Sequence, residues 1–464
     1  MKNKPWIHIL STINGKYVYD VSKDMIISIS DKLAEFLNDM SQVLEQDTQI
    51  EFEQLKKRGF FKESIVKNIK HPMSEYLELY QERNLSSVVL QVTQNCNLRC
   101  KYCIYTVDSG NGQRMHSNKK MSWEIAKEAI DFLWKHSVDS ENITIGFYGG
   151  EPLLEKNLIK KCISYSKKRF AGKKLRFQMT TNATLLDAAS LRYMMENNMY
   201  LMISIDGPKE IHDKNRVFAN TQKGSFDSVI DKIHMIKEEF PEYINQISVN
   251  MVIDTDNDFD LMKKLTQKNG ELEGIRINAS FITNEYVDQN NVPSEKFILA
   301  YGYELFLTYM NMLERIEDSF VTPILSKCKS DDMEMERMMA LSSELGQTSS
   351  PGGPCIPGKR FLIDVDGNFY PCERVSETQK CTSIGSLKRG FDVRQCDAIL
   401  NIHRYNSESC KQCWAFRYCQ TCIRVCSNGE DIKISEKNCR KIRNDVHEKM
   451  LEILLIREMR EGIY

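Results

Sequence analysis

Three cysteines stand within one short segment, at Cys96, Cys100 and Cys103. They follow the apolar run 88–93, which is typical of a strand, so we expect them in the loop at its carboxyl end. An iron–sulfur cluster normally takes four thiolates, so three cysteines would leave one iron for a ligand from outside the protein. Structural zinc prefers four protein ligands, and a fourth is missing nearby. The spacing therefore favours an iron–sulfur cluster over zinc.

A second set of cysteines lies near the end of the chain, where ten of the fifteen fall within residues 355–439. Two of these ten, Cys381 and Cys396, fall outside the ligand-like spacing. The other eight could bind metal: Cys355, Cys372, Cys410, Cys413, Cys419, Cys422, Cys426 and Cys439. Eight thiolates are enough for two four-iron clusters with four ligands each. Zinc is the alternative, because paired cysteines at this spacing also bind zinc.

The overall composition argues against several classes of partner. The 464 residues include 63 basic and 64 acidic ones, and this balance gives no electrostatic case for binding nucleic acid or a membrane surface. Residues 1–6 lack the apolar core of a signal peptide, so we expect a cytoplasmic protein. In a reducing compartment, fifteen cysteines indicate metal or cluster binding rather than a disulfide framework.

The segment that would position the first cysteines alternates between strand and helix from about residue 86 to 320. Such alternation predicts an α/β fold with a parallel sheet. Strands are predicted, mostly as near-continuous apolar runs, at 86–93, 142–148, 174–181, 200–206, 246–253 and 274–282. Helical patterns lie between the strands, such as the one that follows the N-cap Ser122. A long helix is predicted over 294–319.

A second motif, Gly149-Gly150-Glu151-Pro152, ends the second predicted strand, and together with the CxxxCxxC loop it resembles the radical S-adenosylmethionine (radical SAM) enzymes. The resemblance implies a partial (β/α)6 TIM-like barrel, with its chemistry at the carboxyl ends of the strands. It also implies a 4Fe-4S cluster on the three cysteines, whose open iron binds the methionine part of S-adenosyl-L-methionine. The residues that it assigns to the cofactor are Tyr102, Gly149, Gly150, Glu151, Pro152, Asn182, Ser204 and Arg216.

Three of these cofactor residues have simpler alternatives. Asn182 and Ser204 could instead cap the ends of helices, and Arg216 could form a surface ion pair. Ala183 also stands where the family usually has a glycine.

The C-terminal cysteines resemble the SPASM domain of radical SAM peptide maturases, whose pattern is CX9–15GX4C, then CX2CX5CX3C, then C. The chain departs from it at Ile423, which stands at the X3 cysteine position and is flanked by Cys422 and Cys426. The resemblance implies one distal cluster on Cys410, Cys413, Cys419 and Cys439. It implies a second, barrel-facing cluster on Cys355, Cys372 and one or both of Cys422 and Cys426.

Glu373 directly follows Cys372, where the related sulfatase-maturing enzymes carry a carboxylate proposed as a base. A carboxylate beside a thiol or a carbon radical can accept a proton, so the resemblance makes Glu373 the candidate catalytic residue. The alternative is a surface glutamate paired with Arg374.

The first eighty residues contain no cysteine and predict strands at 6–10 and 16–20, then helices at 31–37 and 50–58, the second ending at Gly59. This winged-helix-like module resembles the leader-recognition domains of peptide-modifying radical SAM enzymes, in which a leader peptide adds a strand to the sheet edge. An accessory fold that only braces the barrel is the alternative.

The predicted domains are a leader-recognition module (1–82), a radical SAM partial barrel (83–322), a linker or bridging helix (323–348), a SPASM domain (349–440) and a C-terminal helix (441–464). The resemblance implies a maturase that installs thioether crosslinks in a ribosomally synthesised, cysteine-containing precursor peptide through a 5′-deoxyadenosyl radical, as sactipeptide and ranthipeptide synthases do. It implies S-adenosyl-L-methionine, three 4Fe-4S clusters and an electron donor such as flavodoxin or ferredoxin. Formylglycine formation, carbon–carbon crosslinking and a non-enzymatic iron–sulfur or zinc scaffold are the alternatives.

Overall fold

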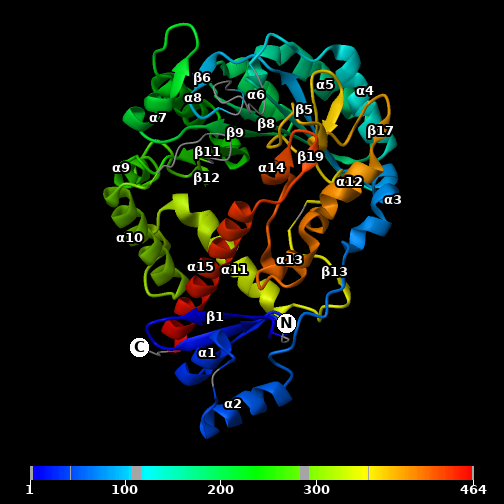
Figure 1. The fold of residues 1–464 in the computed structure, drawn as a ribbon. Coiled ribbons are helices and arrows are strands. Elements are labelled where there is room, and N and C mark those ends of the chain that lie inside the picture. Colours follow the sequence, from blue (N-terminus) through cyan, green and yellow to red (C-terminus); the bar gives the residue numbers. More distant parts are fainter. Residues whose placement is uncertain are drawn as a thin grey trace.

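The computed structural model describes residues 4–41, 43–103, 105, 116–282, 292–353 and 355–461. The largest part is an α/β barrel segment, drawn in cyan and green in the upper part of Figure 1. The N-terminal module lies at the foot, and the C-terminal segment fills the space between the two.

Six parallel strands form the barrel wall, as the sequence predicted. They begin and end close to the predicted bounds: β5 (Ser87–Thr93), β7 (Asn142–Gly149), β8 (Lys174–Thr181), β9 (Met199–Ser204), β11 (Ile247–Ile253) and β12 (Arg276–Phe281). Their hydrogen-bonded order is β12-β11-β9-β8-β7-β5. The predicted α/β class is confirmed, and the carboxyl ends of all six strands meet at one end of the sheet.

Helices connect the barrel strands: α4 (Trp123–Lys135), α5 (Lys156–Arg169), α6 (Ala188–Glu196), α7 (Lys209–Asn215), α8 (Phe226–Glu239) and α9 (Phe259–Lys264). Ser122 caps α4 as predicted, since its side chain accepts from the amide of Ile125. The predicted long helix begins at its cap Ser294 but is shorter than expected, because α10 (Glu295–Met312) is followed by Glu314 at a left-handed φ of 58°.

The barrel sheet continues into the C-terminal segment, which the sequence did not predict. β14 (Phe361–Ile363) pairs in parallel with β5, and the antiparallel strands β15 (Asn368–Tyr370), β16 (Gly385–Ser386) and β17 (Gly390–Phe391) complete a ten-stranded sheet. Phe132 of α4 packs against Phe361, Phe369 and Phe391 at ring-centroid distances of 5.0 to 6.3 Å. Barrel and C-terminal hairpins therefore share one hydrophobic core.

The N-terminal module is an antiparallel sheet of β1 (Ile7–Ser11), β2 (Lys16–Asp20) and β3 (Met25–Ile29), followed by α1 (Asp31–Asn38) and α2 (Gln46–Lys57). Alternate residues of β2 face opposite sides of the sheet. Val18 belongs to a core with residues of α1 and α2, whereas Tyr19 belongs to a second core with Met450. Gly59 follows α2 with a φ of 88°, as a glycine that ends a helix does.

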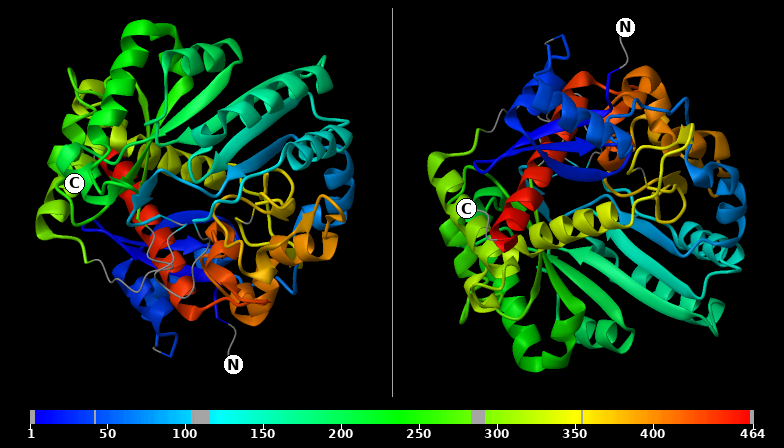
Figure 2. Two further views of the ribbon diagram at one scale, coloured as in Figure 1. Left: turned by 90° about the horizontal axis from the view of Figure 1, so that it is seen from above. Right: turned by 90° about the horizontal axis from the view of Figure 1, so that it is seen from below.

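Two long helices join the module to the rest, α11 (Ser326–Ala340) and α15 (Glu436–Glu461). Figure 2 shows from both sides that α15 lies against the N-terminal sheet, and α15 contacts β1. The remaining elements are β4 (Asn68–Ile69), α3 (Leu77–Arg83), β6 (Leu98–Cys100), β10 (Arg216–Phe218), β13 (Thr348–Ser349), α12 (Val393–Leu400), α13 (Ser407–Lys411), α14 (Ile423–Cys426), β18 (Ser427–Asn428) and β19 (Asp431–Ile432), with several 3₁₀ turns. Within the described ranges, every helix is too short or too polar to span a bilayer.

Candidate functional site

The first cysteine loop lies at the carboxyl end of β5 and is held by a short strand pair. β6 runs antiparallel to β10, which places Cys100 opposite Arg216. The amide of Cys103 donates to the carbonyl of Cys100 at 3.1 Å, and the amide of Lys101 donates to the carbonyl of Asn215 at 3.1 Å. Backbone hydrogen bonds therefore fix the loop on both sides of the central cysteine.

Nitrogen donors surround the sulfurs of this loop. The amide of Leu98 lies 3.4 Å from Cys96 Sγ, and Asn182 Nδ2 lies 3.8 Å from the same sulfur. Arg216 Nη1 lies 3.9 Å from Cys100 Sγ. Burial raises the pKa of the Cys96 thiol to about 12 and that of the Cys100 thiol to about 12, so a bound cation is needed to hold them as thiolates at neutral pH. Buried thiols with N–H donors fit an iron–sulfur cluster.

The two glycines of the second motif bring the end of β7 against the cysteine loop. The amide of Gly150 donates to the carbonyl of Thr93 at 2.9 Å, and the amide of Glu151 donates to that of Asn95 at 2.8 Å. A Cβ at Gly149 would lie 2.1 Å from the Thr93 carbonyl oxygen, and one at Gly150 would lie 2.1 Å from that of Asn95. These glycines thus permit close backbone packing beside the cluster loop.

Glu151 is fully buried, and its carboxylate accepts three hydrogen bonds from the chain. One oxygen accepts from the amide of Leu153 at 3.0 Å and from the hydroxyl of Thr181 at 2.7 Å. The other accepts from the amide of Asn182 at 2.7 Å, and Pro152 begins the 3₁₀ turn that follows. In this structure Glu151 fixes the turn after β8. Its contact with the cofactor stays a prediction.

The turn after β8 also carries the next two predicted positions. Asn182 Nδ2 donates to Asn97 Oδ1 at 2.9 Å, which ties this turn to the cysteine loop. Ala183 adopts a left-handed φ of 61°, a conformation that favours the glycine usual in the family. Ser204 ends β9 and stands in register with Asn250 of β11. Asn182 and Ser204 thus both lie at the carboxyl edge of the barrel, where the sequence placed them.

Arg216 belongs to a buried polar group beside the cluster loop. Its Nε donates to Asp206 Oδ2 at 2.9 Å, and the two side chains are 8% and 1% exposed. Tyr102 donates its hydroxyl to the same carboxylate oxygen, and the guanidinium lies 5.5 Å from the Tyr102 ring centroid. Burial lowers the pKa of Arg216, but Asp206 and its other neighbours outweigh this and raise it. The ion pair is buried rather than on the surface. Sequence reasoning missed Asp206, although it stands two residues after Ser204 in the same run, 203–208.

Four C-terminal cysteines lie near enough to one another for their charges to interact. Burial raises the pKa of Cys410 to about 12, and the neighbouring Cys419, Cys413 and Cys439 raise it further. Burial likewise raises the pKa of Cys439, with Cys419 and Cys413 among its neighbours. These are the four residues predicted for the distal cluster. In the part of the chain that the structure describes, no three histidine, cysteine or carboxylate side chains converge tightly enough to bind a single metal ion.

The other four C-terminal cysteines form a looser set. Burial raises the pKa of Cys372 to about 11, and Cys422 is one of its charged neighbours. Burial raises the pKa of Cys426 to about 12, and its neighbours include Cys422 and, from the first four, Cys439, Cys419 and Cys410. Cys355 is exposed. The structure thus brings Cys372 near Cys422 and places Cys426 between the two sets.

A buried histidine, missed by the sequence reasoning, lies beside one of these thiols. His403 is 1% exposed, and its Nε2 lies 3.3 Å from Cys419 Sγ. Burial lowers the pKa of His403 to about 4, so the ring is neutral near pH 7. The sequence did not predict this contact, because His403 and Cys419 are sixteen positions apart and match no known ligand spacing.

Glu373, the predicted base, has one paired and one unpaired oxygen. Oε1 accepts from Arg360 Nη2 at 2.7 Å, so the ion pair that the structure shows is not the one expected with Arg374. Oε2 is buried and has no hydrogen-bond partner among the described residues. An unpaired carboxylate oxygen beside Cys372 fits a group that accepts a proton.

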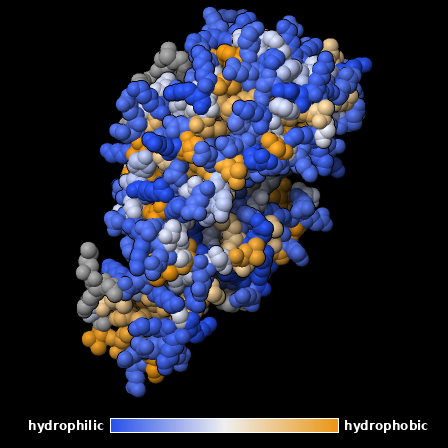
Figure 3. Space-filling model, turned by 90° about the vertical axis from the view of Figure 1, so that its right-hand side faces the viewer, coloured by the Kyte–Doolittle hydropathy of each residue, from blue (hydrophilic) through white to orange (hydrophobic). Residues whose placement is uncertain are grey.

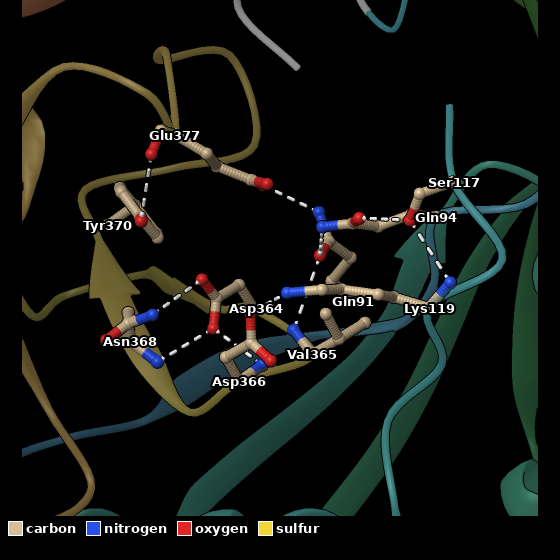
Figure 4. A network of polar contacts seen from close by, with 10 residues as sticks. All are labelled: Gln91, Gln94, Ser117, Lys119, Asp364, Val365, Asp366, Asn368, Tyr370 and Glu377. Carbon is tan, nitrogen blue, oxygen red and sulfur yellow. Dashed lines mark hydrogen bonds and ion pairs between the residues drawn. The ribbon is translucent and has the colours of Figure 1, made fainter. Parts of the chain in front are cut away.

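A polar network joins the barrel to the loop that follows Cys372, as Figure 4 shows. Gln91 of β5 is fully buried, and its Nε2 lies 2.6 Å from Glu377 Oε1 and 3.2 Å from the hydroxyl of Tyr105. Gln94 donates to Gln91 Oε1 at 3.2 Å. The one polar residue within the apolar run 88–92 was the available signal, and it was missed.

The N-terminal module docks on the C-terminal cysteines. Trp6 Nε1 donates to the carbonyl of Cys413 at 3.0 Å. His8 stacks on Trp414 with ring centroids 3.6 Å apart, and its Nε2 lies 2.8 Å from Nδ1 of His447 on α15. Backbone and rings of the distal cysteine loop are therefore part of the module's interface.

Comparison with known proteins agrees with this geometry. Residues 90–266 match the family described as the radical SAM superfamily. The cysteine-type anaerobic sulfatase-maturating enzyme of Clostridium novyi (strain NT) is 29% identical over 298 residues, which are 63% of this chain and 74% of that protein. The enzyme of the same description from Clostridium perfringens (strain ATCC 13124) is 25% identical over 378 residues, 76% of this chain and 92% of that protein.

The solved structure of native anSMEcpe with bound AdoMet has the same fold. It superposes with a TM-score of 0.59 at 19% identity and covers 80% of this chain and 99% of its own. The radical SAM family implies S-adenosylmethionine and a 4Fe-4S cluster, and the buried cysteine loop with its N–H donors fits that cluster. The cysteine loop, the barrel and the radical SAM match over residues 90–266 agree with one another, and the chain is a radical SAM enzyme.

Proposed function

We propose that this enzyme is a maturase that forms thioether crosslinks in a ribosomally synthesised, cysteine-containing precursor peptide. The observation that carries the proposal is the docking of a separate N-terminal sheet on the C-terminal cysteine loops, through Trp6 on the Cys413 carbonyl and His8 on Trp414. A module for peptide binding is thereby held against the domain that would receive the peptide's thiol.

In the barrel, Cys96, Cys100 and Cys103 would hold the first cluster, with Tyr102 and Arg216 beside them. When bound, this cluster and S-adenosylmethionine supply a carbon-centred radical that takes hydrogen from an unactivated carbon. Asn182 and Ser204 lie at the barrel edge where the cofactor's polar groups would sit. The chain's part is to bind and aim these groups.

In the C-terminal segment, we assign Cys410, Cys413, Cys419 and Cys439 to a distal cluster. Cys355, Cys372 and Cys422 would hold a nearer one, with Cys426 as the alternative or additional ligand. Three cysteines would leave one iron open for a substrate thiolate, and Glu373 would take its proton.

The N-terminal module, which we place at residues 1–82, offers one strand edge to a peptide. β2 lies in the middle of its sheet, β1 lies against α15, and no described strand pairs with the outer edge of β3. Met25 of β3 and Ile50 of α2 are 47% and 49% exposed. On the side shown in Figure 3, hydrophobic residues gather at the lower end of the molecule, where this module lies. A leader peptide would add a strand to β3.

Formylglycine formation is the second candidate, because two sulfatase-maturating enzymes are among the relatives and Glu373 fits the base. The solved relative, however, covers only 80% of this chain. The docking of the N-terminal module on the Cys413–Trp414 loop favours the peptide substrate over formylglycine formation.

Two experiments test the proposal. The reconstituted enzyme, reduced with dithionite, must form 5′-deoxyadenosine from S-adenosylmethionine, and a Cys100→Ala variant must not. Without that nucleoside, the chain would be an iron–sulfur or zinc scaffold. Co-expression with a short cysteine-rich precursor, followed by mass spectrometry, should show loss of two hydrogens per crosslink with the sulfur retained. Loss of the sulfur would identify formylglycine made from cysteine instead. Formylglycine made from serine and a carbon–carbon crosslink would each also remove two hydrogens but leave every thiol open to alkylation, and only the former would give an aldehyde that reacts with a hydrazine probe.

A further inference from the structure

His403 makes its one polar side-chain contact, among the described residues, with the sulfur of Cys419. The residue lies in the 3₁₀ turn Ile402–Asn406, which follows α12. It is 1% exposed, and its Nε2 is 3.3 Å from Cys419 Sγ. Its other ring nitrogen, Nδ1, is buried and has no hydrogen-bond partner in the described part of the chain. The ring is therefore aimed at the thiol and at nothing else polar.

Thr421 stands beside the same sulfur. It is 2% exposed, and its Oγ1 lies 3.2 Å from Cys419 Sγ, with the thiol as donor. A thiolate cannot donate, so once Cys419 loses its proton the threonine hydroxyl must rotate to donate to the sulfur. The imidazole N–H at Nε2 donates in the same way. A thiolate at this position would then accept two hydrogen bonds from fully buried groups.

The turn that carries His403 is held in place by Asn401, which precedes it, and by Arg404, which lies within it. Asn401 is fully buried, donates to Ser74 Oγ at 2.7 Å, and accepts from the amide of His71 at 2.7 Å. Arg404 donates to the carbonyl of Ile69 at 2.9 Å. Contacts to a segment more than 300 positions away in sequence hold the histidine against Cys419, as partners of a metal ligand are usually held.

We propose that His403 and Thr421 donate hydrogen bonds to the Cys419 sulfur and thereby raise the reduction potential of the auxiliary cluster that Cys419 holds. The inference rests on the proposed function, in which Cys419 is a ligand of the distal cluster. A reduced cluster carries more negative charge than an oxidised one, so N–H and O–H donors at its sulfur stabilise the reduced form more. In the proposed reaction, closing the thioether leaves one surplus electron, and a higher potential favours its uptake by this cluster.

The test is a potentiometric titration followed by electron paramagnetic resonance on the full, iron-reconstituted chain. A Cys96→Ala, Cys100→Ala, Cys103→Ala background removes the first cluster, and a further Cys419→Ala identifies the signal of the distal one. His403→Phe keeps a planar ring without a nitrogen. We expect the ratio of reduced to oxidised distal cluster to fall about tenfold at a fixed applied potential, which equals a shift of about 59 mV for a one-electron couple.

Two further variants separate hydrogen bonding from packing. His403→Gln has an N–H donor of similar reach and should recover most of the ratio. Thr421→Val, which keeps the shape of the side chain, should lower the ratio without touching the histidine. Unchanged potentials in His403→Phe and Thr421→Val overturn the proposal. So does loss of the cluster's iron in both His403 variants, because the imidazole would then be a ligand. If Cys419→Ala keeps all its iron, the ligand assignment in the proposed function fails instead.

Discussion

The buried pair of Asp206 and Arg216 gives the sharpest prediction about the barrel. The carboxylate accepts from the guanidinium at 2.9 Å, from the Tyr102 hydroxyl, and from the amide of Val252 at 3.3 Å. Asp206→Asn keeps the size of the side chain but removes its charge, and this leaves a guanidinium that is 8% exposed without a counter-ion. Removing one partner of a buried pair costs about 3–5 kcal/mol of unfolding free energy.

The assay is urea unfolding of the cluster-free chain, monitored by far-ultraviolet circular dichroism. The unfolding free energies of the variants are compared where the dependence of free energy on urea concentration has the same slope. The matched control is Asp227→Asn in the surface pair with Lys209, whose side chains are 69% and 53% exposed. That change should cost no more than about 1 kcal/mol. The double variant Asp206→Asn, Arg216→Gln should recover part of the loss, because it removes the unpaired charge. If Asp206→Asn costs as little as the surface control, the reasoning is refuted.

Three other predictions follow from backbone geometry and burial. Gly150→Ala should displace the Asn95 carbonyl, whose oxygen would lie 2.1 Å from the new Cβ, and should lower both the iron content and the melting temperature. The control is Gly172→Ala, which has a φ of 89° but open space around its Cβ. It should lower the unfolding free energy by about 1 kcal/mol and leave the iron content unchanged. Ala183→Gly should relieve about 1 kcal/mol of backbone strain at its φ of 61°. The extra conformational entropy of glycine in the unfolded chain offsets about 0.4–1 kcal/mol of this gain. The melting temperature should therefore stay the same or rise slightly, and a lower one would contradict the prediction. Burial and a neighbouring imidazole lower the pKa of His8 from 6.5 to about 4. As the pH falls from 6.5 toward 4, the unfolded chain therefore binds a proton at His8 before the folded chain does, and the folded state loses stability. Protection of the N-terminal sheet from hydrogen exchange should fall over this range in the natural sequence but not in a His8→Phe variant.

Local patterns in the sequence were enough for the barrel. Its strands are apolar runs between turn residues, and helix starts such as Ser122 carry their own cap, so periodicity predicted both. The first cysteine loop was equally predictable from the sequence, because three ligands within one loop need no distant partner. Asp206 was within reach as well, since it stands at a strand end beside Ser204, but the sequence could not show that Arg216 would be its counter-ion rather than a surface group.

Contacts between distant segments were not predictable in this way. Trp6 meets Cys413 across 407 positions, and Gln91 meets Glu377 across 286, because packing and not periodicity brings them together. The partner of Glu373 shows the same limit. Its neighbour in sequence, Arg374, was the obvious candidate, yet the pair forms with Arg360.

The pairing of β14 with β5 bears on how the two cysteine regions work together. The serine, proline and glycine run 349–354 predicts a linker, and a linker would let the C-terminal cysteines move relative to the barrel. In the structure, Leu90 of β5 pairs with Ile363 of β14. β5 leads into the Cys96 loop, and the hairpin that begins at β14 leads into the Cys372 loop. The two loops therefore extend from one hydrogen-bonded sheet, the Cys96 loop from β5 and the Cys372 loop from β15, with β14 between these strands. The buried Gln91–Glu377 contact joins them again. The separation between the Cys96 loop and the Cys372 loop is set by this sheet, so under the proposed function a peptide held between them would meet two sites at a fixed separation.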